Sequence, residues 1–102
     1  MWESGVDSRW GYQSFLKKQI MYYCYLVRCA DGTLYCGSTR DPGRRIAQHN
    51  TGAGSAYVYT HGGGKIVYTE TFATVGDALR REIQIKKLAR RRKENLILGL
   101  KP

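Results

Sequence analysis

Short apolar and aromatic runs alternate along this chain with segments whose apolar residues recur at helical spacing. Residues 21–29 and 33–38 are rich in aromatic and β-branched types, which is typical of strands. They flank Ala30-Asp31-Gly32, whose glycine stands where a three-residue hairpin loop needs a left-handed residue. Apolar residues alternate again over residues 65–72, which predicts a third strand.

The length of the hairpin loop decides which side chains share a face. A three-residue loop places position 25 opposite 37 and position 27 opposite 35, so that Tyr25, Tyr35 and Gly37 lie on one face. A two-residue loop of Asp31-Gly32 would instead put the two tyrosines on opposite faces. We favour the three-residue loop, and with it a patch that both hydroxyl groups share.

A helix is expected directly after the hairpin. Asp41 can cap it, and Pro42 suits its first position because the missing N–H is not needed there. Thr51-Gly52 is expected to end it. Arg45 and His49 are four residues apart and therefore fall on one side of this helix, next to the tyrosine patch.

A longer helix is predicted over residues 75–92, with Thr74 as its N-cap and Asp77 completing part of a capping box. Glu82 falls in the centre of its apolar side, among Val75, Ala78, Leu79, Ile83, Ile85 and Ala89. A carboxylate there is costly to bury unless it is paired or binds a metal. Two interpretations stay open: an ion pair with Arg45 or another cation, and a metal ligand.

The remaining segments are less informative. The glycine-rich residues 52–64 form either a mobile flap that contacts a nucleic-acid backbone or only a long connection. Residues 95–100 are expected to pack on the sheet as a last short helix, and Glu70 is expected to be a solvated strand residue. The pattern as a whole predicts an α+β fold, a small sheet of three mainly antiparallel strands flanked by helices.

The net charge of the chain indicates what kind of partner it binds. The net charge is +9 and the isoelectric point about 9.8, which is typical of nucleic-acid-binding domains, although a merely basic surface is the alternative. Eight basic residues crowd into residues 80–93, and we expect them to contact phosphates: Arg80, Arg81, Lys86, Lys87, Arg90, Arg91, Arg92 and Lys93.

Other classes of protein fit the sequence less well. No run approaches the roughly 18 apolar residues of a membrane helix, and the N-terminus has no signal-peptide pattern, which predicts a cytoplasmic protein. The three cysteines are odd in number and lack zinc-site spacing, so we expect small buried residues rather than a disulfide scaffold.

The motifs together resemble those of the GIY-YIG nuclease family. Tyr23-Cys24-Tyr25 stands where the family has GIY, and Tyr35-Cys36-Gly37 stands where it has YIG. Arg45 and His49 follow at the family's helix spacing, and Glu82 lies in the matching later helix. The chain is most similar to the small stand-alone members of the family, which have no second domain.

The resemblance covers about residues 21–99 and implies a division of the chain. Residues 21–102 would form the GIY-YIG-like domain, and residues 1–20 an N-terminal extension of unknown role.

The resemblance also implies roles for individual residues. Tyr25 would be the general base, and Tyr35 and His49 would position water and phosphate. Arg45 has the donors to bind the scissile phosphate, and Glu82 would hold one divalent metal, Mg²⁺ or Mn²⁺. A tyrosine base needs a pKa below the ordinary value of about 10, and we expect nearby cations and metal to lower it.

Two functions from different classes remain. The first is a metal-dependent endonuclease that hydrolyses phosphodiester bonds in DNA, with a role in DNA repair or recombination. The second is a non-catalytic nucleic-acid-binding module that retains the nuclease fold. The combination of two tyrosines, an arginine, a histidine and a glutamate favours the enzyme, because a binding module needs only the basic surface.

Overall fold

The computed structural model describes residues 20–102, so the expected N-terminal extension lies outside the described residues except for its last position. In chain order, the elements within this part are β1 (Tyr22–Cys29), β2 (Leu34–Thr39), α2 (Pro42–Thr51), α3 (Ala56–Thr60), β3 (Gly64–Phe72), α4 (Val75–Lys86) and α5 (Arg90–Ile97). This is the expected α+β fold.

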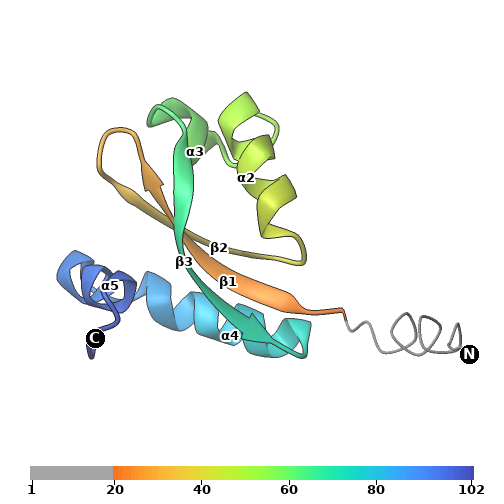
Figure 1. Ribbon diagram of the computed structural model, residues 1–102, viewed down its shortest axis with the longest axis vertical. Helices are drawn as coiled ribbons and strands as arrows, with labels where there is room; N and C mark the ends of the chain where they lie inside the picture. Colours follow the sequence, from red (N-terminus) through yellow and green to blue (C-terminus); the bar gives the residue numbers. More distant parts are fainter. Residues whose placement is uncertain (1–19) are drawn as a thin grey trace, which may run out of the picture.

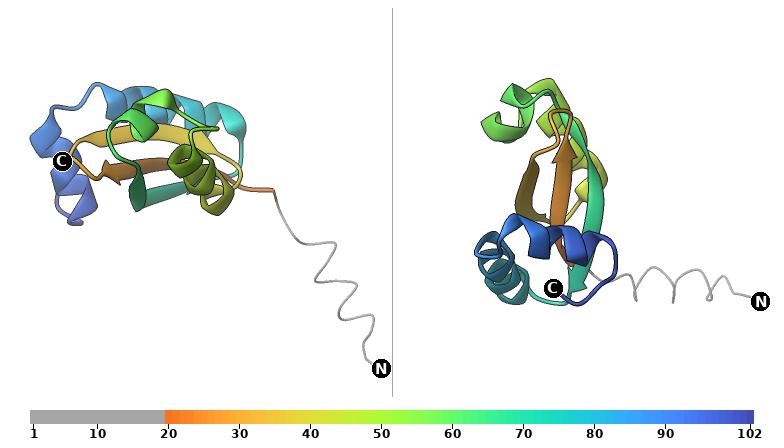
Figure 2. Two further views of the ribbon diagram at one scale, coloured as in Figure 1. Left: turned by 90° about the horizontal axis from the view of Figure 1, so that it is seen from above. Right: turned by 90° about the vertical axis from the view of Figure 1, so that its left-hand side faces the viewer.

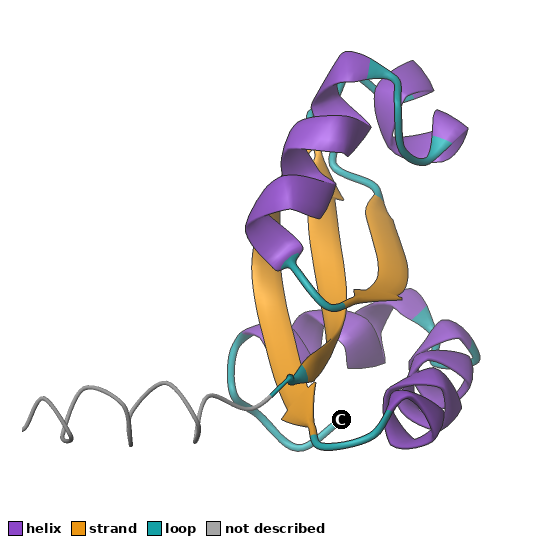
Figure 3. Cartoon of the chain, turned by 90° about the vertical axis from the view of Figure 1, so that its right-hand side faces the viewer, coloured by secondary structure: helices purple, strands orange, loops and turns teal. Residues whose placement is uncertain are grey.

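The three strands form one antiparallel sheet in the order β2-β1-β3 (Figure 1). Helices α2 and α3 lie together on one side of the sheet, and α4 and α5 lie together on the other (Figures 2 and 3). The central strand β1 is therefore covered on both faces. Alternate residues feed two cores, with Cys24 and Leu26 packing toward α4 and α5, and Tyr25 and Val27 toward α2 and α3.

The hairpin has the predicted three-residue loop. Gly32 takes a φ of 89°, the Cys29 N–H donates to the Thr33 carbonyl at 2.9 Å, and Tyr25 lies opposite Gly37. The shared face of the two tyrosines is confirmed, because their ring centroids are 6.4 Å apart.

The predicted helix starts are also confirmed. The Asp41 carboxylate accepts a hydrogen bond from the Arg44 N–H at 3.1 Å, and the Thr74 hydroxyl accepts one from the Asp77 N–H at 3.1 Å. At the end of α2, Gly52 adopts the expected left-handed conformation with φ 86°.

The prediction of one helix over residues 75–92 is wrong. Helix α4 ends at Lys86, and α5 begins after Ala89, which is extended with ψ 156°. The break turns the chain so that Leu96 packs against Ile85 and the sheet, where it is 7% exposed. Burial of Leu96 outweighs the good helix propensity of the residues between α4 and α5.

The predicted apolar side of α4 is only partly right. Ala78 and Ile85 are buried, whereas the side chains of Val75, Leu79 and Ile83 are about half exposed. A narrower stripe of the helix meets the sheet than the sequence pattern indicated. Glu82 nevertheless lies on that stripe, between the two buried residues, with its side chain 16% exposed.

The glycine-rich segment contains more structure than the sequence predicted. Ser55 caps the short helix α3, and Val58 of that helix is fully buried beside Tyr25. Gly62 and Gly63 then take positive φ values of 93° and 77° to reach β3. A role of this segment as a mobile flap stays a prediction.

Two smaller expectations have mixed outcomes. The cysteines Cys24, Cys29 and Cys36 are buried, as predicted. Glu70 is not a solvated residue, because it accepts two hydrogen bonds from Arg81.

Among residues 20–102, no helix combines the length and apolar character needed to cross a membrane.

Candidate active site

A buried tyrosine and a buried histidine meet on the α2 face of the sheet. The Tyr25 Oη and His49 Nε2 atoms are 2.8 Å apart, and each residue is 1% exposed. Tyr35 packs its ring edge-on to His49 with the centroids 5.3 Å apart. The spacing of four residues in α2 and the hairpin register thus bring three predicted site residues together.

The backbone of the α2–α3 connection determines which nitrogen of His49 carries the proton. The Ser55 N–H donates to Nδ1 at 2.8 Å, so Nδ1 must be an acceptor. A neutral imidazole then carries its proton on Nε2 and donates it to Tyr25 Oη. Burial, and secondarily the charge of Arg45, holds the pKa of His49 below its ordinary value, which favours this neutral form.

Two glycines leave the room that this pair requires. A Cβ atom on Gly37 would lie 2.6 Å from Tyr25 Oη, and one on Gly54 would lie 2.4 Å from His49 Nδ1. Sequence reasoning found Gly37 through the motif but missed Gly54 and Ser55. Nothing in the glycine-rich stretch distinguishes these two positions until the fold places them against the histidine.

Glu82 lies on the other helix layer, beside the edge strand β2. Its Oε1 accepts a hydrogen bond from the Ser38 hydroxyl at 2.7 Å, and its Oε2 is 2.7 Å from Lys86 Nζ. The ion pair considered from the sequence therefore exists, but its cation is Lys86 and not Arg45. Ser38 was not predicted as a site residue, although it follows the second motif directly.

Residues 20–102 contain no group of three or more His, Cys, Asp or Glu side chains that could hold a metal. The donor set of Glu82 is still suitable for Mg²⁺ or Mn²⁺, since Mg²⁺ often takes only one or two carboxylates and completes its shell with waters and phosphate oxygens. Metal binding there would require Lys86 to leave the carboxylate.

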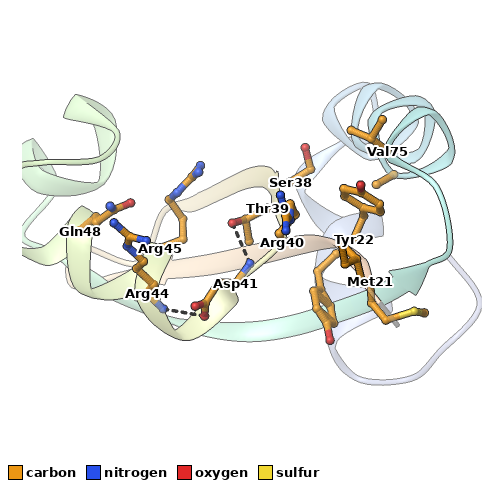
Figure 4. Close-up of a pocket in the computed structure, with 13 residues that line it drawn as sticks. Met21, Tyr22, Ser38, Thr39, Arg40, Asp41, Arg44, Arg45, Gln48 and Val75 are labelled. Atoms are coloured by element: carbon orange, nitrogen blue, oxygen red, sulfur yellow. Dashed lines mark hydrogen bonds between the residues drawn. The ribbon is translucent and has the colours of Figure 1, made fainter. Parts of the chain in front are cut away.

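The cations of the protein do not lower the pKa of Tyr25, so the expectation that they would is wrong. Burial raises the pKa of Tyr25 to about 12, and the charge of Tyr35 acts in the same direction. Arg45 opposes this shift as the neighbouring cation, but burial dominates. Arg45 is half-buried on α2, and with Ser38 it lines a groove at the end of β2 (Figure 4).

The eight basic residues of the C-terminal helices do not form one free surface. Four of them are paired with carboxylates: Arg80 with Asp77, Arg81 with Glu70, Lys86 with Glu82, and Arg90 with Glu94. The break between α4 and α5 separates the others. Contact of these basic residues with phosphates remains a prediction. The ion pairs weaken that prediction for Arg80, Arg81 and Arg90. They do not affect it for the four residues of this group that have no ion pair among residues 20–102, which are Lys87, Arg91, Arg92 and Lys93.

The match to a family of known proteins agrees with this geometry. A family model described as the GIY-YIG catalytic domain matches residues 21–95, which include every candidate catalytic residue and Glu82. The chain belongs to the GIY-YIG nuclease family. The expected relation to the family is thereby confirmed.

Similar proteins share most of this region. A UPF0213 protein of Pseudomonas aeruginosa is 46% identical over 76 residues, which cover 74% of this chain and 73% of that protein. A UPF0213 protein of Halobacterium salinarum is 42% identical over 74% of this chain and 99% of its own length. That relative therefore has little sequence beyond the region that it shares with this chain.

Two solution structures have a similar fold. The UPF0213 protein from Bacillus halodurans superposes with a TM-score of 0.50 at 38% identity, covering 76% of this chain and 83% of its own. A protein from E. faecalis gives a TM-score of 0.54 at 34% identity, covering 78% and 84%. These relatives support the fold and the family assignment.

Proposed function

We propose that this GIY-YIG protein is a metal-dependent endonuclease that hydrolyses phosphodiester bonds in DNA. The observation that carries the proposal is the hydrogen bond between Tyr25 and a histidine whose tautomer is fixed. The family assignment supports a nuclease, and the basic net charge supports a nucleic-acid substrate.

In this proposal Tyr25 first loses its hydroxyl proton to solvent, and the ionised Oη then takes a proton from the attacking water as that water adds to the phosphorus. The Nε2–H of His49 donates to the same oxygen and so stabilises the negative charge that forms when Tyr25 is ionised. Burial lowers the effective dielectric constant around this pair and so strengthens the hydrogen bond, although it also raises the energy of the charged tyrosine.

Arg45 binds the phosphate, and its planar group of donors suits the equatorial oxygens. Tyr35 holds the imidazole in place through its edge-on contact, and its hydroxyl would position water and phosphate. Glu82, held by Ser38, is the residue that would bind Mg²⁺ or Mn²⁺. Such an ion, when bound, supplies positive charge to the phosphate and acidifies coordinated water.

Two observations favour the second candidate, a nucleic-acid-binding module without catalysis. Glu82 is already paired with Lys86 at 2.7 Å, and the pKa of Tyr25 is about 12. Both features oppose catalysis unless substrate and metal rearrange the charges around them. The endonuclease remains our first proposal, because a binding module has no need of a histidine with a fixed tautomer.

Cleavage of labelled DNA in the presence and absence of Mg²⁺ tests the proposal. Duplex, single-stranded and branched substrates should be compared, since a role in repair or recombination, which we include in the proposal, predicts preference for a non-duplex structure. Tyr25→Phe removes the hydroxyl and should abolish cleavage while the fold persists. Metal-dependent cleavage by the parent that survives in Tyr25→Phe would remove Tyr25 from the mechanism.

A further inference from the structure

A groove next to the candidate site carries positive charge that is not neutralised by any ion pair among residues 20–102. It runs from α2 across the end of β2 to the starts of β1 and α4 (Figure 4). Arg40, Arg44 and Arg45 line it, and none of them lies within ion-pair distance of a carboxylate among the described residues. Asp41 also lines it, so the described lining holds three cations and one anion.

Asp41, the one acidic residue of the described groove lining, is engaged at the start of α2. Its carboxylate serves as the cap of α2 and accepts the Arg44 backbone N–H, and it forms no ion pair with the Arg44 guanidinium. Arg40 and Arg44 are exposed, whereas Arg45 is half-buried nearer to Tyr25. The groove thus leads outward from the candidate cutting position along a line of arginines.

The opposite part of the groove has a different chemistry. It has an apolar and aromatic wall that includes Met21, Tyr22 and Val75, whereas Tyr23, the next residue of β1, points to the opposite face of the sheet. Val75 is 53% exposed. Figure 4 shows Arg40 between this wall and the arginines of α2. Cations beside aromatic rings are the combination with which proteins bind unpaired nucleotides, because the bases stack while the phosphates contact the guanidinium groups.

We propose that this groove binds a single-stranded nucleic-acid segment that flanks the bond to be cut. Arg40 and Arg44 contact its phosphates, and Tyr22 stacks on one of its bases. A duplex offers phosphates but hides its base faces, so it would leave the aromatic wall unused. The inference rests on the proposed function in one respect, which is that the bond to be cut lies at the candidate active site.

Binding measured by fluorescence anisotropy in EDTA tests this inference without hydrolysis. The probes are a labelled single strand of about 12 nucleotides and the duplex of the same sequence. The parent protein should bind the single strand about tenfold more tightly than the duplex. Equal or tighter binding of the duplex would overturn the proposal, and this comparison needs no variant.

Paired charge-removing variants test whether the groove is the binding site. Arg40→Ala/Arg44→Ala should weaken single-strand binding at least about tenfold and reduce the salt slope by about 1.4, because two phosphate contacts are lost. The matched control, Lys65→Ala/Lys101→Ala, removes the same charge at two exposed positions outside the groove and should change affinity less than about twofold. Equal losses in the two variants would contradict a dedicated groove.

Two variants of Tyr22 test the aromatic wall. Tyr22→Ala should weaken single-strand binding about fivefold to tenfold and leave duplex binding unchanged. Tyr22→Phe keeps the ring and should bind like the parent, whereas losses in both variants would argue against stacking. A protein that binds single strands but never cuts would refute the proposed function and leave this inference standing.

Discussion

The Gly54→Ala variant tests whether the α2–α3 connection sets the geometry of the candidate site. The new methyl group would lie 2.4 Å from His49 Nδ1 and 3.0 Å from the His49 backbone nitrogen. Real carbon atoms do not approach so closely, and the buried imidazole has little room to move, since Tyr25 holds its other nitrogen. Either the ring or the turn must shift, and the hydrogen bond from Ser55 breaks.

The cost of this change can be worked out from the packing. Forcing one methyl group into a filled interior costs about 2 kcal/mol. For a domain of this size, that loss should lower the midpoint of thermal unfolding by about 10 °C. Gly76→Ala is the matched control, because its nearest heavy atom would be 3.6 Å away and the residue lies in α4. It should be neutral or stabilise by up to about 1 kcal/mol.

Two measurements on these variants decide the question. Thermal unfolding followed by circular dichroism gives the stability, and ¹⁵N NMR of the His49 ring reports which nitrogen is protonated. The parent and Gly76→Ala should show the Nε2–H tautomer, and Gly54→Ala should lose it. A Gly54→Ala protein that is as stable as the control and keeps the Nε2–H tautomer would refute the reasoning.

Three further predictions follow from the charges and hydrogen bonds. Burial holds the pKa of His49 below its unfolded value of about 6.5. The contribution of neutral His49 to stability is therefore present above that pH and is lost as the pH falls. The free energy of unfolding from urea titrations should decrease between about pH 7.5 and 5, and His49→Gln should reduce that decrease. Glu94→Gln weakens the pair with Arg28, whose nitrogens lie 2.6 Å from the carboxylate, and should lower the free energy of unfolding by about 1 kcal/mol in the same assay; no change would show that water replaces this pair. Ser38→Ala removes the hydrogen bond to Glu82 and should raise the Mg²⁺ concentration for half-maximal cleavage about tenfold; an unchanged concentration would mean that Ser38 does not position the carboxylate.

Local sequence signals predicted the part of the fold that local chemistry determines. The Gly32 loop fixed the hairpin register, and the register placed Tyr25 and Tyr35 on one face. Asp41 and Thr74 marked the helix starts, because a side-chain oxygen at an N-cap satisfies a neighbouring N–H. The four-residue spacing then brought His49 to Tyr25.

Contacts between distant segments were not predictable in the same way. The end of α4 depends on burying Leu96 against the sheet, which no local pattern reveals. The cation that pairs with Glu82 is Lys86, one turn along the same helix, whereas the sequence indicated only Arg45 or another cation. The pKa of Tyr25 depends on how deeply the fold buries it, and the sequence shows its cations but not its desolvation.

Cleavage by the Glu82→Gln variant, measured with its thermal midpoint, tests the central claim most directly. Glutamine keeps the shape and can still accept from Ser38 but loses most metal affinity, so we predict a folded protein that no longer cuts DNA in Mg²⁺. Glu70→Gln is the matched control, because Glu70 is also partly buried and paired, with Arg81. It should lose some stability and still cut. A well-folded Glu82→Gln protein that cuts at the parent rate would contradict the account, as would a parent that cuts no DNA in Mg²⁺ or Mn²⁺.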